Sequence, residues 1–203
     1  MSHPDSSADA PAPIIPDRPG LEGLEDRWDA TWEERGTYHF DRTKARADVF
    51  SIDTPPPTVS GSLHVGHVFS YTHTDTIARY QRMAGREVFY PMGWDDNGLP
   101  TERRVQNYFG VRCEPALPYD PDFDAPDDAG DPKAIKKRGD IDISRRNFIE
   151  LCHVLTAEDE QAFETLFRRL GLSVDWAQNY ATIDERCQRA SQRAFLRNLA
   201  RGE

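Results

Sequence analysis

Apolar residues recur with a helical period over much of the chain, and short continuous apolar runs interrupt this pattern. Leu21, Leu24, Trp28 and Trp32 fall at 0, +3, +7 and +11, which predicts an amphipathic helix that ends at Gly36. At this spacing we expect the two tryptophans in the core rather than on the surface as base-stacking side chains.

A strand, a helix and a second strand are predicted next. The apolar run Val49–Asp53 predicts the first strand, and the run Glu87–Pro91 predicts the second. Between them a helical period covers about 63–84 and ends before Gly85, in the place of a C′ glycine. The residues expected on the buried face of this helix are Val65, Val68, Phe69, Thr72, Thr76, Ile77, Tyr80 and Met83. This order of elements implies a right-handed parallel crossover, and hence an α/β fold.

The rest of the chain is mostly helical in pattern. Pro100 is placed to begin a helix that Gly110 ends. Further helices are predicted over 144–155, over 157–170 with Thr156 as N-cap, and over 184–201. The expected organisation is a disordered, proline-rich leader (1–20), a helical segment (21–48), an α/β segment (49–112), an irregular insertion (113–142) and a helical remainder (143–203).

The amino-acid composition argues against several classes of function. The chain has 25 Lys and Arg against 35 Asp and Glu, a formal charge of −10, which argues against nucleic-acid binding as its main role. No apolar run reaches the ~18 residues of a membrane span, so no membrane partner is expected. The three cysteines are widely spaced and odd in number, which disfavours a disulfide framework and fits a reducing cytoplasm.

The loop before the long helix carries the strongest chemical signal. A loop that enters a helix N-terminus binds anions, because the first-turn N–H groups are unpaired and the macrodipole is positive there. His64 and His67, one helical turn apart, add donors on the same face, while Gly61, Ser62 and Gly66 leave room for a bulky ligand. The pattern favours a nucleotide phosphate over two alternatives, a pair of surface histidines or a zinc site.

Other candidate sites have weaker support. Asp95 follows a predicted strand, at the sheet edge where α/β proteins bind ligands, although an isolated loop carboxylate is often only solvated. A zinc site would need His73, which lies on the far side of the helix from His67, so no metal is predicted. Cys113 with Cys152-His153 lacks the C-x-x-C spacing of a metal site.

Two arginine doublets need a separate interpretation. Arg103-Arg104 and Arg145-Arg146 could face RNA. In an acidic chain such doublets are more often solvated or salt-bridged than bound to RNA, and we expect one of these two states.

Three ordered blocks resemble the class I aminoacyl-tRNA synthetases. Pro55-Pro-Pro-Thr-Val-Ser-Gly-Ser-Leu-His-Val-Gly-His67 resembles their "HIGH" signature, with a lead-in most similar to the valyl-tRNA synthetases. Tyr90-Pro-Met-Gly-Trp-Asp-Asp-Asn-Gly-Leu-Pro-Thr-Glu102 resembles the Gly-Trp-Asp-x-x-Gly-Leu-Pro loop of the branched-chain enzymes. Gly171-Leu-Ser-Val-Asp-Trp176, followed by Tyr180-Ala-Thr-Ile183, resembles the segment before their editing insertion. The resemblance runs from about Leu21 to the end.

The resemblance implies a Rossmann-like, nucleotide-binding catalytic domain, of which 49–112 is the first half. The full enzyme activates valine with ATP and Mg²⁺ and transfers it to tRNA(Val). The resemblance also implies that His64 and His67 are catalytic and contact the ATP phosphates, and that Asp95 pairs with the α-ammonium of valine. The implied ATP-binding residues are Thr58, Gly61, His64, Gly66 and His67, and the implied amino-acid-binding residues are Pro56, Pro57, Thr58 and Asp95. Many valyl enzymes have Asn at the position of Thr58. Asp96 and Asn97 also differ from the common residues and receive no role.

Several parts of a class I synthetase have no counterpart in the sequence. These are the Lys-Met-Ser-Lys-Ser signature, the editing insertion, the second half of the nucleotide fold and the anticodon-binding helices. We therefore expect an N-terminal fragment that is inactive, or nearly so, alone. Isoleucyl or leucyl specificity, a stand-alone His-x-Gly-His nucleotidyltransferase and a non-catalytic synthetase-like binding module remain alternatives.

Overall fold

The computed structural model describes residues 20–61 and 63–203, so the predicted leader lies, apart from Gly20, outside the described residues. In chain order the elements are α1 (Leu24–Glu34), η1 (Arg46–Asp48), β1 (Val49–Ser51), α2 (Val65–Met83), β2 (Glu87–Phe89), β3 (Gly93–Trp94), α3 (Leu99–Phe109), β4 (Val111–Cys113), α4 (Pro132–Arg138), β5 (Ile141–Ile143), α5 (Arg145–Arg169), η2 (Trp176–Gln178), β6 (Tyr180–Ala181) and α6 (Glu185–Arg201).

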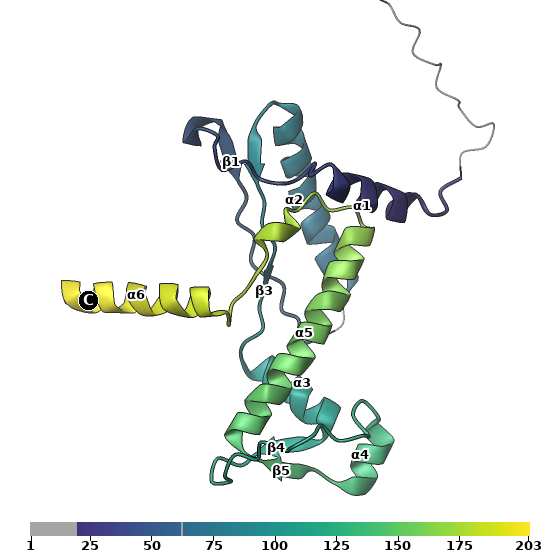
Figure 1. Cartoon of the computed structure of the whole chain (residues 1–203), viewed down its shortest axis with the longest axis vertical. Coiled ribbons are helices and arrows are strands. Elements are labelled where there is room, and N and C mark those ends of the chain that lie inside the picture. Colours follow the sequence, from purple (N-terminus) through teal and green to yellow (C-terminus); the bar gives the residue numbers. More distant parts are fainter. Residues whose placement is uncertain (1–19, 62) are drawn as a thin grey trace, which may run out of the picture.

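The strands of the described residues form three short parallel pairs, β1 with β2, β3 with β6, and β4 with β5 (Figure 1). In the first pair Val49 lies opposite Glu87, and α2 makes the connection between the two strands. The predicted parallel strand–helix–strand unit is therefore confirmed. The second pair joins the chain just after β2 to a segment 87 residues later, with Trp94 opposite Ala181.

Glycines end three helices where the sequence predicts them to. Gly36, Gly85 and Gly110 have φ of 57°, 82° and 62° just after α1, α2 and α3. A residue with a Cβ is strained at such angles, whereas glycine adopts them freely, so these positions stop a helix and turn the chain.

Two hydrophobic clusters share one long helix. Phe163 and Phe167 of α5 belong to the cluster that includes Val88 of β2 and Trp94 of β3. Phe148, Leu151 and Leu155 belong to the cluster around α3, β4 and β5. Figure 1 shows α5 running along the molecule and connecting its two ends. This helix therefore fixes the position of the β1–α2–β2 unit relative to the α3 region.

The predicted break within this helix is wrong. α5 is continuous from Arg145 to Arg169, and Thr156, expected as an N-cap, lies inside it. The Thr156 hydroxyl donates a hydrogen bond to the carbonyl of Cys152 at 2.9 Å, so the side chain is satisfied within the helix. Of residues 113–142, expected to be irregular, the first belongs to β4, and the last part forms α4 and most of β5.

The predicted buried face of α2 is also wrong. Val65 and Met83 are 82% and 81% exposed, and Phe69, Ile77 and Tyr80 are exposed as well. The buried residues of α2 are instead Tyr71, Asp75 and Ala78. The helix thus presents its more polar side to the rest of the described chain.

Ionic hydrogen bonds explain this orientation of α2. The buried Asp75 carboxylate accepts hydrogen bonds from Arg79 Nε at 2.6 Å and from the backbone N–H and hydroxyl of Ser173 at 2.6 and 2.5 Å. Arg82 donates to the hydroxyl and carbonyl of Ser173 at 2.5 and 2.8 Å, and Arg79 donates to the Gly171 carbonyl. These contacts attach α2 to the segment after α5.

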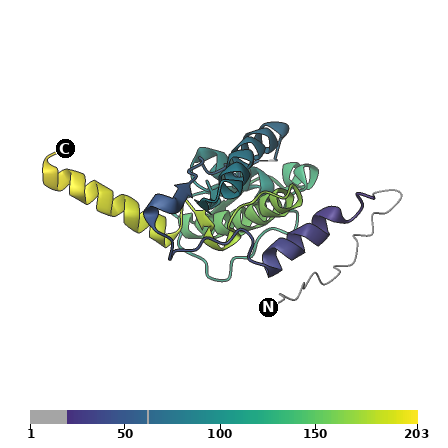
Figure 2. The same cartoon turned by 90° about the horizontal axis from the view of Figure 1, so that it is seen from above.

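The first and last helices are largely exposed. Trp28 is 39% exposed, so its predicted core position is wrong, and it stacks on the half-buried Trp32 with ring centroids 6.0 Å apart. α6 extends away from the other elements in both views (Figures 1 and 2). None of the helices within the described ranges has the length and apolar character needed to cross a membrane.

Candidate functional site

The two histidines form the N-terminal cap of α2. His64 is the N-cap residue, and its Nδ1 accepts a hydrogen bond from the Gly66 N–H at 3.1 Å. His67 Nδ1 accepts one from the His64 N–H at 3.3 Å, and the two ring centroids are 4.0 Å apart. The loop after β1 and the first turn of α2 therefore hold both imidazoles side by side.

This cap determines which ring nitrogen of each histidine can act as a donor. A neutral imidazole carries its hydrogen on one nitrogen and accepts at the other. Because Nδ1 is the acceptor in both rings, Nε2 carries the hydrogen in His64 and in His67. Burial, followed by the electrostatic interaction with the neighbouring His64 ring, lowers the pKa of His67, which favours the neutral ring. The helix start thus offers two fixed N–H donors, besides its dipole, to an anion.

Gly66 is required by the cap itself. A Cβ at this position would lie 2.9 Å from Cε1 and 3.0 Å from Nδ1 of His64. Any side chain would push the His64 ring out of its hydrogen bond, so glycine is needed here whatever the ligand.

An open cavity of about 430 Å³ connects the proline loop with α2. It is lined by Thr54, Pro55, Pro56, Pro57, Thr58, His67, Ser70, Tyr71 and Thr74. Tyr71 fixes one wall, because its hydroxyl donates to the Pro55 carbonyl at 2.6 Å, and burial raises the pKa of this phenol to about 12. The fold thus brings His67 next to Pro56, Pro57 and Thr58, whereas Gly61, His64 and Gly66 do not line the cavity.

Asp95 lies beside this cavity, between two threonine hydroxyls. Its backbone bridges to Thr58, and the Thr58 hydroxyl donates to Oδ2 at 3.3 Å. The Thr182 hydroxyl donates to Oδ1 at 3.3 Å and also accepts the Asp96 N–H at 3.2 Å. The pairing of β3 with β6 brings Thr182 to this place. Thr182 is not predicted as a site residue from the sequence, because no periodicity marks it.

A half-buried carboxylate with two hydroxyl neighbours, next to paired N–H donors and a small cavity, can bind a ligand that carries both an ammonium group and anionic oxygens. A comparison with protein families identifies the kind of chain that carries this site. The sequence model of the tRNA synthetases class I (I, L, M and V) matches residues 27–116 and 131–203. The chain belongs to the class I tRNA synthetases.

Named relatives agree with this assignment. The synthetase chain is similar to the valine–tRNA ligases of Thermobifida fusca (strain YX) and Bifidobacterium longum (strain DJO10A), each 67% identical over 189 residues. The match covers 93% of this chain and 21% of each relative, so the chain spans about a fifth of the length of these curated relatives.

A solved structure shares the fold. The agnB2 LeuRS of Agrobacterium radiobacter K84, in its ternary complex with tRNA and LeuAMS, matches with a TM-score of 0.59 and 25% identity. The match covers 88% of this chain and 17% of that one. The predicted Rossmann-like α/β fold of a class I synthetase is confirmed.

The arginine doublets of this synthetase chain are partly salt-bridged. Arg104 makes a bidentate ion pair with Asp159, with both N–O distances 2.5 Å, and Arg146 lies 3.4 Å from Glu150. The expectation that the doublets are solvated or salt-bridged is confirmed for these two residues. Arg103 forms no ion pair with any described residue and is exposed.

Metal ligands do not gather in the described residues. No group of three or more His, Cys, Asp or Glu side chains within residues 20–61 and 63–203 is placed to hold a metal ion. Cys113 and Cys152 are free thiols, and burial raises the pKa of Cys152 to about 11.

A buried carboxyl pair lies next to the Asp95 loop. Asp96 is 3% exposed. When Asp96 and Glu160 of α5 are both ionised, neither carboxylate oxygen of Asp96 has a hydrogen-bond partner among the described residues. Its neighbour is Glu160 of α5, and burial, together with a hydrogen bond to Asp96 and the charge of that group, raises the pKa of Glu160 to about 8. Burial raises the pKa of Asp96 as well. The two carboxyl groups therefore share a proton near neutral pH.

This pair makes the stability of the chain depend on pH. An unfolded glutamate has a pKa of about 4.3 and the folded Glu160 one of about 8, so folding takes up a proton between these values. The contribution is complete below about pH 4.3, and it is lost as the pH rises through about 8. We measure the free energy of unfolding in urea from pH 5 to 8.5. It should fall less steeply with rising pH for Glu160→Gln than for the unmodified chain. Parallel curves for the variant and the unmodified chain would contradict the shared proton.

Proposed function

We propose that this chain provides the first part of the catalytic domain of a valine–tRNA ligase, which activates valine with ATP and attaches it to tRNA(Val). The observation that carries the proposal is the cavity of about 430 Å³ that joins His67 to the proline loop beside Asp95. The 67% identity to two valine–tRNA ligases over 93% of the chain supports valine as the amino acid.

In this function His64 and His67 bind the phosphates of ATP. The carboxylate of valine attacks the α-phosphate, and negative charge then grows on the departing pyrophosphate. Fixed Nε2–H donors stabilise this charge more in the transition state than in the ground state, and they need no reorganisation because the cap already orients them. Gly61 and Gly66 keep the backbone open to the nucleotide.

Asp95 binds the α-ammonium group of valine. The hydroxyls of Thr58 and Thr182 hold its two oxygens, so the carboxylate keeps one orientation toward the cavity. Pro56, Pro57 and Thr58 form the wall for the side chain of valine, and rigid proline rings restrict its size. Such a wall disfavours an amino acid whose side chain is one methylene larger by about 1–3 kcal/mol.

Mg²⁺ fits this site as a companion of ATP. Because the described residues offer no cluster of three ligands, the ion would be held mainly by the substrate phosphates, as is common for Mg²⁺, and would neutralise their charge. We place the reaction in the cytoplasm, where reduced cysteines such as Cys113, Cys152 and Cys187 are stable.

Amino-acid-dependent exchange of pyrophosphate into ATP tests the proposal. We expect the complete ligase that carries this segment to catalyse exchange with valine, and to prefer valine to isoleucine and leucine in kcat/KM. Preference for isoleucine or leucine would contradict the assigned amino acid. Absence of exchange together with transfer of a cytidylyl group from CTP would favour a nucleotidyltransferase instead.

A further inference from the structure

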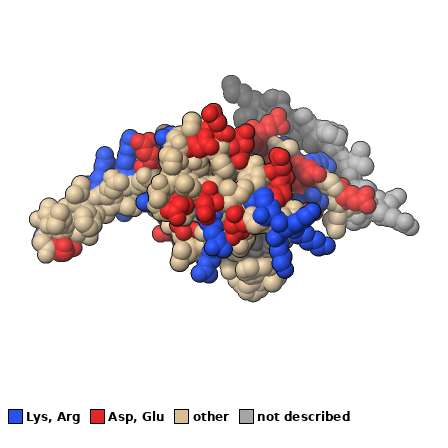
Figure 3. Space-filling view, turned by 90° about the horizontal axis from the view of Figure 1, so that it is seen from below, with Lys and Arg blue, Asp and Glu red and all other residues tan. Residues whose placement is uncertain are grey.

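Most carboxylates in the described part of this acidic chain are in contact with solvent. Figure 3 shows many of them among basic side chains on one face of the molecule. Within the described ranges, only Asp75, Asp96 and Asp175 are buried acidic residues. Asp75 accepts hydrogen bonds from an arginine and a serine, and Asp175 accepts from the N–H groups of Phe40 and Ala177 at 3.0 and 3.2 Å. Asp96 is the exception, because no donor of the described residues reaches either of its oxygens.

The group that Asp96 faces is the carboxyl group of Glu160 on α5, and the two are joined by a hydrogen bond. Two ionised carboxylates can only accept and repel each other, so this bond requires a proton on one of them. Burial raises the pKa of both groups, and that of Glu160 to about 8, so the proton is present at neutral pH. The charges of Asp95 and Asp159 favour it further, whereas the electrostatic effect of His153 opposes it.

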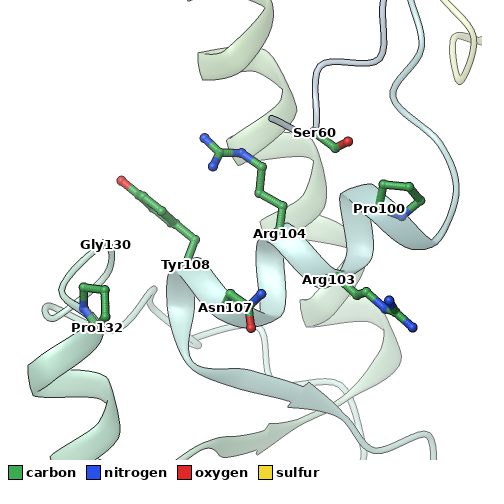
Figure 4. A pocket seen from close by; sticks show the side chains of 8 residues that line it. All are labelled: Ser60, Pro100, Arg103, Arg104, Asn107, Tyr108, Gly130 and Pro132. Carbon is green, nitrogen blue, oxygen red and sulfur yellow. The ribbon is translucent and has the colours of Figure 1, made fainter. Parts of the chain in front are cut away.

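Two further carboxylates lie near this carboxyl pair, and each already has an arginine as its partner. Asp159 makes the bidentate ion pair with Arg104, and Glu164 accepts a hydrogen bond from Arg168 Nε at 2.7 Å. Arg103, next to Arg104 in the sequence, leaves α3 in a different direction (Figure 4). The shared proton is therefore what joins the carboxyl pair.

The backbone of Asp96 belongs to the proposed valine site. Its N–H donates to the hydroxyl oxygen of Thr182 at 3.2 Å, and the same hydroxyl donates to Asp95 Oδ1 at 3.3 Å. A hydroxyl group has one hydrogen, so the N–H that binds its oxygen leaves this hydrogen directed toward Asp95. The N–H of Thr182 is itself bound to the Trp94 carbonyl at 2.9 Å. A shift of Asp96 would thus change the positions of the hydroxyl and of the Asp95 carboxylate together.

The Asp95 loop is attached to two different elements. On one side, the Asp95 N–H donates to the Pro57 carbonyl of the proline loop at 2.9 Å. On the other side lies α5, which is packed firmly at this point, because Phe163, one turn after Glu160, contacts Trp94 with ring centroids 6.4 Å apart. The carboxyl pair is the polar contact that connects the loop to this helix.

We propose that Asp96 and Glu160 are positioning residues of the amino-acid site: the hydrogen bond between their carboxyl groups holds the Asp95 loop against α5 and so directs Asp95 toward the ammonium group of valine. Neither residue lines the cavity beside Asp95, so both act through the loop. Loss of the shared proton leaves two buried anions that repel each other, and the loop then moves away from α5. The inference rests on the proposed function, because valine is the ligand that Asp95 would bind.

The pH dependence of pyrophosphate exchange by the complete ligase tests the proposal. We expect the KM for valine to rise by roughly 3- to 10-fold, the scale of one hydrogen bond, as the pH rises through about 8, while the KM for ATP stays constant. In Glu160→Gln the amide can donate to Asp96 at every pH, so this rise should be absent. The ammonium group of valine titrates equally in both measurements, so it cancels in the comparison.

A second variant removes the hydrogen bond at neutral pH. Glu160→Met keeps the length of the side chain but cannot hydrogen-bond Asp96, and we expect it to raise the KM for valine by roughly 3- to 10-fold, with a much smaller change in kcat. Glu160→Gln should restore a nearly normal KM. Glu158, an exposed glutamate of the same helix, provides the matched control, and Glu158→Met should leave both constants unchanged.

Three results would overturn the positioning role. The first is a KM for valine that is constant around pH 8 in the unmodified ligase, which needs no variant to fold. The second is the same pH profile in Glu160→Gln and in the unmodified ligase. The third is an equal rise of the KM for valine and for ATP in Glu160→Met, which would indicate a general loosening of the site. Absence of valine-dependent exchange in the unmodified ligase would instead refute the proposed function.

Discussion

Replacement of His67 by alanine is expected to lower the rate of valyl-adenylate formation by about 10²–10³, the scale of one lost transition-state donor. The His67 Nδ1 is engaged by the His64 N–H, so the ring presents Nε2–H outward, and alanine removes this donor completely. The effect should appear in kcat for pyrophosphate exchange by the complete ligase. The Kd for valine should change much less, because the proposed partner of the ammonium group is Asp95.

Two comparisons make this result specific. His73→Ala removes a histidine from the exposed side of the same helix, where its ring packs against Phe69 at 4.1 Å, and we expect it to leave exchange nearly unchanged. A His67→Ala enzyme that loses adenylate formation and valine binding by equal factors would contradict the phosphate assignment, since it would indicate a general disruption of the site.

Replacement of Asp75 by alanine is expected to reduce the free energy of unfolding of the 203-residue chain by about 3–5 kcal/mol. The buried carboxylate accepts from Arg79 and twice from Ser173, and its loss leaves these donors without their partner. The cost comes mainly from the unpaired groups that remain buried. Urea-induced unfolding followed by circular dichroism measures it directly.

The neighbouring residue provides the control for this change. Thr76 is exposed, and its hydroxyl bonds only to the Thr72 carbonyl of its own helix, so Thr76→Ala should alter stability by no more than about 0.5 kcal/mol. A loss below about 1 kcal/mol for Asp75→Ala would show that the contacts between α2 and the segment after α5 are not what orients α2.

The polar orientation of α2 also explains where the sequence prediction of its buried face failed. Periodicity locates an apolar stripe from local spacing, and the stripe from Val65 to Met83 is present in the sequence. It does not reveal whether another element of the chain covers the stripe. Here Asp75, Arg79 and Arg82 find partners in 171–173, and the opposite face is the exposed one.

In α5, too, a local sequence pattern and the tertiary packing lead to different results. Thr156 has the residue type of an N-cap, and Gly171 is a suitable stop, so local rules predict a second helix. The helix continues because Phe148 and Leu155 pack in one cluster while Phe163 and Phe167 pack in the other. Packing against both clusters outweighs the local preference of one threonine for a helix start.

The sequence by itself determined the features that depend on neighbouring residues. It predicted the strand–helix–strand unit, the helix ends at Gly36, Gly85 and Gly110, and a loop that places His64 and His67 at a helix start, because turn chemistry and capping act over a few residues. Its motifs also led to the family.

Only the tertiary structure decided the features that join distant segments. The pairing of β3 with β6 places Thr182 against Asp95, and α5 brings Glu160 to Asp96. An open cavity along α3 likewise combines Ser60 with Gly130, which are far apart in the sequence. No local sequence pattern predicts these pairs, because long-range contacts arise from the packing of whole elements. This packing selects which side chains share a buried or charged environment.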